Sequence, residues 1–317
     1  MKRSFLLLIV VLSSVGLLGH AAGEIAWSVL DIDPGVRALG MGGAAVALGD
    51  GAETLYYNPA ALAGVSGIAV NTLLSSQLGI GSYSAFSAVM RNVGIGYLTM
   101  NSGDIQGYDA GGNATGALAY SSGAFLLGFG VDPRTFGFAL PMASSFGGRI
   151  KYITADNGGT TGSGFAVDVA AQFETNDMLL GPVAIGSPRF SVSATNILGT
   201  MGYDGRSEAF PMGLRFGAAA WISRMVLVAM DLDLAGGFHL GFEYPVVPTL
   251  AVRAGLKSQA GGISITVGVG LNVSGFVIDY ALMTHALLSA SHRVSLSLDF
   301  STLDLTALTQ SLRRLLP

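Results

Sequence analysis

The feature that most constrains this chain is a strict alternation of apolar with small or polar residues, repeated in short segments from Val65 almost to the end. In Gly262 to Leu271, five branched apolar residues alternate with Ser264, Thr266 and two glycines. In His292 to Phe300, apolar residues occupy every second position, and Arg293, Ser295, Ser297 and Asp299 lie between them. Alternation over such lengths predicts half-buried β-strands.

The same pattern predicts fifteen strands, near residues 65–74, 81–90, 92–101, 114–121, 123–131, 145–154, 163–173, 188–197, 211–221, 224–233, 237–244, 249–257, 262–271, 275–282 and 292–300. Single-chain bacterial barrels have even strand counts. One of the fifteen is therefore in error, and the most irregular region is Ser121 to Ser145. We predict about 14 strands. Tight turns are expected at Arg91-Asn92 and Val273-Ser274, and long, outward-facing loops at 103–113, 155–162, 176–188 and 198–210.

Two architectures fit this alternation: a soluble β-protein with an apolar core, or a membrane barrel with an apolar exterior. Half of the residues are apolar and only 11% are charged, which is about half the charged fraction of an ordinary soluble domain. Beyond the N-terminus, no apolar run approaches the ~20 residues that a helical span needs. The faces opposite the apolar stripes carry mostly Gly, Ala, Ser and Thr. The sequence therefore predicts an all-β fold, a transmembrane antiparallel β-barrel with its small residues turned inward.

Isolated ionisable residues on the polar faces are predicted to lie in the lumen, since an Arg or Lys facing lipid at the midplane costs roughly 2–4 kcal/mol. Opposite charges on successive strands are expected to pair across the lumen wall. The expected pairs are Lys151 with Asp168, Arg215 with Asp231, Glu243 with Arg253, and Asp279 with Arg293.

The ends of the chain divide into distinct segments. Lys2 and Arg3 precede a short apolar run and small residues, so residues 1–23 are predicted to be a cleaved signal peptide. Residues 24–62 form a connector and a Gly/Ala-rich stretch that ends in the motif Asn58-Pro59-Ala60. The barrel is assigned to 63–300. The tail, 301–317, has leucines at helical spacing, and either covers the mouth of the barrel or docks a partner.

The stretch from Arg37 to Leu62, RALGMGGAAVALGDGAETLYYNPAAL, resembles the N-terminal signature of the FadL-like outer-membrane barrels, and most of all their PorV/PorQ-like branch. Further matches lie at 151–153 with 164–168, at 253–257, at 279–281 and at 292–296. Ala61 stands where the family usually has Gly. The resemblance implies an outer-membrane location and an N-terminal plug inside the lumen, shaped by Arg37, Gly40, Gly42, Gly43, Asp50, Asn58, Pro59 and Ala60. The same residues could simply fill and stabilise the barrel.

Several other classes of function are disfavoured. A net charge of −4 gives no reason to expect nucleic acid, and the absence of cysteine excludes thiolate chemistry. Gly40 to Gly43 lacks the strand–helix context of a nucleotide loop. The four histidines have no metal-ligand spacing, and no serine is marked as a nucleophile. We assign no catalytic, metal or cofactor site, and the resemblance implies a non-enzyme.

Three functions remain open. A FadL-like channel would bind hydrophobic small molecules and predicts an apolar pocket beside the plug and a kinked strand. A PorV-like barrel would be a partner of secretion or surface-attachment machinery. A purely architectural barrel would have a closed lumen. In each case the surrounding partner is outer-membrane lipid.

Overall fold

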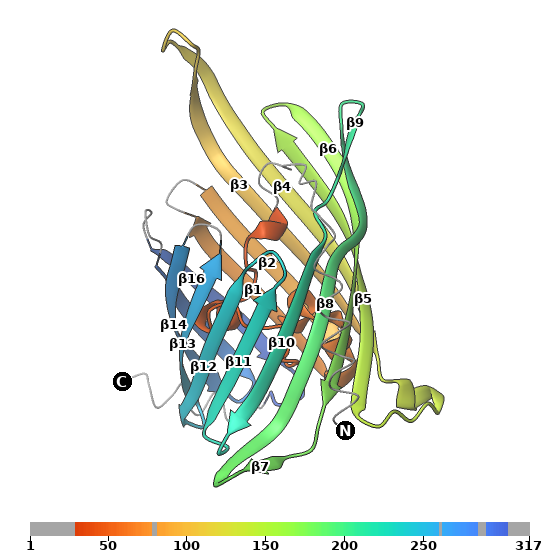
Figure 1. Ribbon diagram of the computed structural model, residues 1–317. Helices are drawn as coiled ribbons and strands as arrows, with labels where there is room; N and C mark the ends of the chain where they lie inside the picture. The colour runs from red at the N-terminus through yellow and green to blue at the C-terminus, as the bar shows by residue number, and fades with distance from the viewer. Residues whose placement is uncertain (1–28, 78–80, 260–261, 285–289, 304–317) are drawn as a thin grey trace.

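The computed structural model describes residues 29–77, 81–259, 262–284 and 290–303. Fourteen strands form one closed antiparallel ring, in which β16 pairs with β1 and β8 pairs with β10 (Figure 1). The ring consists of β1 (Ile68–Gln77), β2 (Gly81–Met90), β3 (Val93–Tyr108), β4 (Ala114–Val131), β5 (Ala143–Asn157), β6 (Thr160–Glu174), β8 (Val183–Tyr203), β10 (Gly213–Ile222), β11 (Val226–Asp233), β12 (Phe238–Val247), β13 (Leu250–Gln259), β14 (Gly262–Val273), β15 (Phe276–Met283) and β16 (Ser291–Asp299). The predicted count of fourteen is confirmed.

Two short strands, β7 (Met178–Leu180) and β9 (Arg206–Ala209), pair only with β8 in the described chain. Within the described ranges there are five short helices: η2 (Val29–Asp31), α2 (Val36–Gly40), α3 (Thr54–Tyr57), η3 (Pro59–Gly64) and η4 (Pro133–Phe136). The first four belong to the N-terminal segment, which lies within the ring of strands (Figure 1). The predicted signal peptide and residues 304–317 of the predicted tail lie outside the described residues.

Several sequence-based boundaries are wrong. The strands expected at 114–121 and 123–131 are the single strand β4, since glycine at 123 does not interrupt its pairing with β3 and β5. Much of 103–113 belongs to β3, and 198–210 contains the end of β8 and all of β9. These two stretches are rich in glycine and polar residues, but each folds back on a neighbouring strand.

The ring has two different ends, which we call the turn end and the hairpin end. The turn end carries the tight turns at Arg91-Asn92 and 274–275. At the hairpin end, β3 and β4 rise above the wall (Figure 1). The loop expected at 176–188 contains β7 and the start of β8. Strand alternation places the remaining connection at the turn end, contrary to the expectation that all long connections face outward. It joins β6 to β8 at the same end as the β2–β3 turn.

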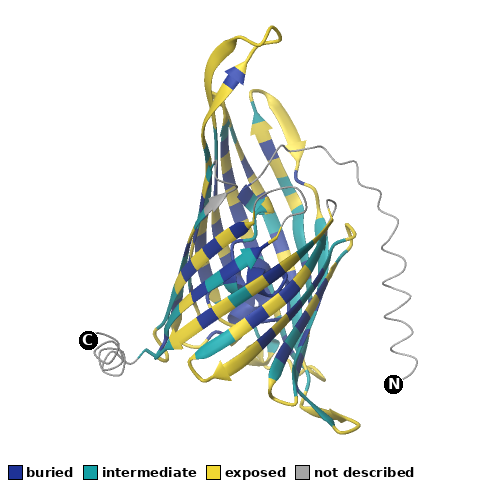
Figure 2. Ribbon diagram, turned by 90° about the vertical axis from the view of Figure 1, so that its left-hand side faces the viewer, coloured by how far each residue is buried: buried dark blue, intermediate teal, exposed yellow. Residues whose placement is uncertain are grey.

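The apolar residues of the alternating strands face outward. On β14, Ile263, Ile265, Val267, Val269 and Leu271 are all exposed, whereas Thr266 between them is fully buried. Bands of alternating burial follow the other strands as well (Figure 2). This is the pattern of a barrel whose exterior is solvated by lipid. Among the helices of the described residues, none has the length and apolarity needed to cross a membrane.

One strand of the wall is kinked. Pairing between β6 and β8 passes from Val167↔Leu198 to Val169↔Ala194, so Asp168 faces three residues of β8. In the middle of these, Asn196 has a left-handed φ of 55°. At the same point β8 changes neighbours: up to Thr195 it pairs with β10, and from Thr200 onward with β9. Such bulges bend and twist a strand locally.

Candidate functional site inside the barrel

The inner wall has a slot for the N-terminal segment, made by two glycines that pair with each other, Gly241 of β12 and Gly255 of β13. A Cβ on Gly255 would lie 2.2 Å from the Gly42 nitrogen, and one on Gly241 would lie 2.4 Å from the Met41 oxygen. Gly42 itself has a φ of +69° and faces the backbone of Leu256. A side chain on any of the three glycines would prevent this contact between two backbones.

The end of the segment uses a second set of wall glycines, on β4 and β5. A Cβ on Gly130 would lie 2.4 Å from the Pro59 oxygen, and one on Gly147 would lie 2.5 Å from the Ala60 nitrogen. The motif is fixed in turn by Asn58, whose side-chain oxygen accepts from the Ala60 N–H at 3.0 Å. The predicted turn at Asn58-Pro59-Ala60 is therefore the start of the 3-10 helix η3.

Polar side chains of the wall satisfy the backbone of the segment between these two regions. The Gly42 N–H donates to the Thr266 hydroxyl at 2.9 Å. Both Ala45 and Val46 donate their N–H to one carboxylate oxygen of Asp231, at 2.9 and 3.1 Å. His239 Nδ1 lies 2.7 Å from the Gly42 oxygen and must donate to it, since a carbonyl only accepts. These wall groups replace the water that the irregular backbone would otherwise need.

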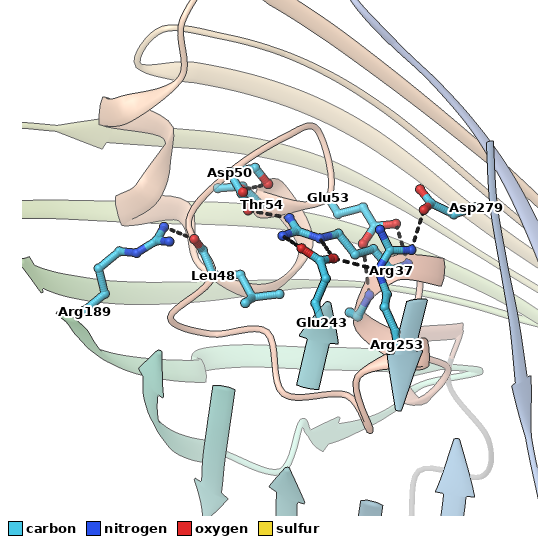
Figure 3. A network of polar contacts seen from close by, with 10 residues as sticks. Arg37, Leu48, Asp50, Glu53, Thr54, Arg189, Glu243, Arg253 and Asp279 are labelled. Atoms are coloured by element: carbon cyan, nitrogen blue, oxygen red, sulfur yellow. Dashed lines mark hydrogen bonds and ion pairs between the residues drawn. The ribbon is translucent and has the colours of Figure 1, made fainter. Parts of the chain in front are cut away.

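A network of guanidinium and carboxylate groups ties α2 to three strands (Figure 3). Arg37 forms a bidentate pair with Glu243, at 2.8 and 2.9 Å, and also reaches Asp50 at 2.6 Å. Arg253 bridges Glu243 at 2.6 Å and Asp279 at 2.5 Å. The second bridge crosses β14 above Gly270, where an added Cβ would lie 2.5 Å from Asp279. Buried charges of this kind are stable only while every partner remains.

Glu53 belongs to the same region but has no ion pair with a basic residue of the described chain. Its carboxylate instead accepts the N–H groups of Val36, Arg37 and Ala38 at 2.9, 3.3 and 3.4 Å. Burial, together with the charge of Asp279, raises the pKa of Glu53 to about 7. The first N–H groups of a helix have no partner within it, so Glu53 supplies the acceptors that α2 lacks.

The chain before α2 is held by a different acid. Asp33 forms an ion pair with Lys257 at 2.5 Å, and its backbone oxygen accepts from Arg293. Burial alone would raise the pKa of Asp33, but Lys257, with Arg215 and Arg293, more than offsets burial and holds it below the usual range. Asp33 therefore stays ionised and anchors the entry to α2.

A third cluster lies where β8 is kinked. Asp168 is fully buried and pairs with Arg149 at 2.5 Å and with Lys151 at 2.7 Å. Its other contact is the Asn196 N–H at 2.8 Å, so the bulge is organised around this carboxylate. Arg149 also donates to the backbone oxygens of Leu55 and Tyr56. One cluster thus joins the bulge to the N-terminal segment.

Two of the four expected ion pairs are present, Lys151 with Asp168 and Glu243 with Arg253. The other two expectations are wrong. Arg215 pairs with Asp233, its direct neighbour in the β10–β11 register, and this leaves Asp231 to the segment backbone. Asp279 pairs with Arg253 across β14, and Arg293 turns to Asp33 and lies over the ring of Tyr83.

Toward the hairpin end the interior is apolar. Val29 is fully buried in η2, which packs against β3 and β4, and Leu30 and Ile32 lie against the same cluster. The cluster continues through inward-facing residues of the strands around it, among them Leu98, Met100, Ile153, Met201 and Phe210. Residues 29–33, expected to be part of a connector, are therefore part of the packed interior, and the apolar cluster that they join also includes Met201 of β8.

A cavity of about 380 Å³ lies toward the turn end. It is bounded by the network of Figure 3, by Pro248 and Thr249 of the β12–β13 turn, and by Asp299. Its lining is mixed, since the charged network shares it with apolar residues such as Leu48, Val247 and Leu250. It therefore matches only in part the apolar pocket expected beside the segment. Within the described ranges, no group of histidine, aspartate or glutamate side chains has the geometry of a metal site.

Sequence reasoning missed the residues that fit the segment to the wall. Glycine abundance was visible in the sequence, but nothing marked Gly241, Gly255, Gly130 or Gly147 as contact points, because each contact joins positions far apart in the chain. Glu53 could have been suspected as a lone acid between two small residues, Ala52 and Thr54.

Comparison with protein-family models finds no match to this sequence, and comparison with curated proteins finds none either. Two solved structures of similar fold are the monoaromatic hydrocarbon channel CymD and the toluene transporter TodX of Pseudomonas putida. CymD superposes with a TM-score of 0.54 at 14% identity, covering 87% of this chain and 99% of its own. TodX has the same score at 13% identity, with 86% and 98% covered. The chain therefore shares the barrel fold of these two proteins.

Proposed function

We propose that this protein is an outer-membrane barrel that takes part in the passage of hydrophobic small molecules, and that it has no enzymatic role. The observation that carries the proposal is the apolar cluster around Val29, Leu30 and Ile32 inside the wall, a cluster that also includes Met201 of the kinked strand β8. The segment's own apolar residues occupy a space that a small hydrophobic guest could take. The fold shared with two hydrocarbon carriers supports the same reading.

In this proposal the segment is a plug. A guest bound near η2 is separated from the turn end by residues 34–62, which are held in the wall slots and by the ion-pair network. Passage therefore requires that this segment leave the wall at least transiently. The cavity of about 380 Å³ lies on the far side of the segment and is the exit toward the turn end. We assign the turn end to the periplasm because barrels place short turns there.

The test is a reversible lock. The chain has no cysteine, and a Cβ on Gly217 would lie 3.0 Å from the Val46 Cβ. The same Cβ would lie 2.8 Å from Asp231 Oδ1 and 3.0 Å from the Ala47 nitrogen, so the segment must shift slightly away from β10. This shift also brings the two Cβ atoms to the distance of about 3.5–4.5 Å that a disulfide needs, so the pair Val46→Cys/Gly217→Cys can form one. Uptake of toluene by cells that express the oxidised variant should fall to the level of cells without the barrel, and a reductant should restore it. Oxidised protein that transports like the wild type would refute the proposal.

A further inference from the structure

The α2 end of the plug is held by the carboxylate of Glu53, which differs from the neighbouring carboxylates because no arginine forms an ion pair with it in the described chain. Four acids, Asp50, Glu53, Glu243 and Asp279, share two guanidinium groups in this region. Each of the other three acids lies within 2.8 Å of an arginine nitrogen. Glu53 has only backbone N–H donors. Glu53 is therefore the acid of this group whose carboxylate is most easily protonated.

We propose that Glu53 is a proton-operated latch of the plug: its protonated side chain keeps α2 in the wall slot, and its ionisation favours release of α2 from the wall. This inference rests on the proposed function, because it describes how the plug of the proposed channel is regulated. It does not depend on which molecule passes.

The surroundings of Glu53 fix the sign of the effect. The titratable and charged groups that face it come from every neighbouring element: Arg37 on α2, Tyr57 on α3, Asp50 in the turn, Glu243 on β12, Arg253 on β13 and Asp279 on β15. The nearest contacts of Arg37 and Arg253 are to the other acids, so their charges offset an ionised Glu53 only in part, and burial together with the charge of Asp279 outweighs them. In the released segment the same carboxylate is hydrated and ionises without this cost.

The magnitude follows from proton linkage. Burial and Asp279 raise the pKa of Glu53 from 4.5 to about 7 while the segment is docked. The docked state therefore binds the proton more tightly than the released state. Docking is most stable below pH 4.5 and weakens as pH rises toward 7. Between pH 5.5 and pH 8, the equilibrium constant for release should increase about 30-fold.

Hydrogen exchange at Val36, Arg37 and Ala38 measures this equilibrium directly, because in the described structure the bonds from their N–H groups are to Glu53. The comparison is between the wild type and Glu53→Gln, an isostere of the protonated acid, in nanodiscs at each pH. The ratio of their rates cancels the intrinsic pH dependence of exchange. We expect this ratio to rise about 30-fold from pH 5.5 to pH 8. A ratio that stays constant would overturn the proposal.

Two controls complete the experiment. In Asp177→Asn, the lost carboxylate lies outside this group of acids and pairs with the exposed Arg224, so the pH dependence should remain. If Glu53→Gln does not assemble, the wild-type rates can be divided by those of β14 amides in the same molecule, and the same rise is expected.

A flat exchange ratio with an intact effect of the disulfide lock would refute the latch alone. A pH-dependent ratio with no effect of the lock on uptake would refute the channel function and leave the latch.

Discussion

The slot formed by Gly241 and Gly255 gives the most specific prediction. In Gly255→Ala, the new methyl group would lie 2.2 Å from the Gly42 nitrogen and 2.4 Å from the Met41 carbonyl carbon. Both are backbone atoms, so no side-chain rotation can relieve the contact. The segment must move by at least about 1 Å to reach an ordinary van der Waals distance.

This shift breaks two buried hydrogen bonds of Gly42. In one, the Gly42 N–H donates to the Thr266 hydroxyl, and in the other, the Gly42 oxygen accepts from His239. Each is worth about 1 kcal/mol, and overpacking adds about 1–3 kcal/mol. Docking of the segment should therefore weaken by about 3–5 kcal/mol, which is between about a hundredfold and a few thousandfold in the release equilibrium. The strand itself keeps its hydrogen bonds, because alanine is accepted within the ladder.

The assay is single-channel conductance in planar bilayers. Migration of the unheated protein in a denaturing gel checks that the barrel has folded. Gly255→Ala should fold like the wild type and should open far more often. The matched control is Gly148→Ala, on the outward face of β5, where the new Cβ comes no closer than 3.4 Å to a neighbour. If Gly255→Ala behaves like Gly148→Ala in conductance and stability, the close contact between segment and wall does not exist.

Two further substitutions test the buried charges. Asp168→Ala leaves two buried cations without an acidic partner and should lower the free energy of unfolding in urea by about 3–5 kcal/mol. Arg224→Ala, which removes an exposed pair, should change it by less than about 0.5 kcal/mol. Gly270→Ala places a methyl group between Arg253 and Asp279 and should lower the same free energy by about 1–3 kcal/mol. An unchanged urea midpoint in either Asp168→Ala or Gly270→Ala would contradict the ion-pair geometry.

The barrel itself could be predicted because its information is local. The alternation along β14 or β16 can be recognised within a single segment of sequence. The scarcity of charged residues on the opposite faces then distinguishes a membrane barrel from a soluble β-protein. The count of fourteen followed from the even number that such barrels require, together with the resemblance to FadL-like barrels. Even the erroneous break at 121–123 was local, since a glycine next to serine looks like a strand end when its neighbours are unknown.

The interior could be predicted only in part, because its contacts depend on register and on distance along the chain. Arg215 pairs with Asp233 and not with Asp231, and this reflects a two-residue difference in register that the sequence does not show. Gly270 lets Arg253 reach past β14, so the pair skips a strand. The fit of Gly42 to Gly255 links positions more than 200 residues apart.

The central claim is that the N-terminal segment lies against the inner wall of the barrel, and one measurement tests it most directly. In membranes of cells that express Val46→Cys/Gly217→Cys, mild oxidation should join the two positions in most molecules, as seen by mass spectrometry of the linked peptides. The pair Val46→Cys/Ala218→Cys, whose second residue faces the outside of the wall, should not link. Efficient linkage to position 218, or no linkage to 217 in a folded barrel, would contradict the account.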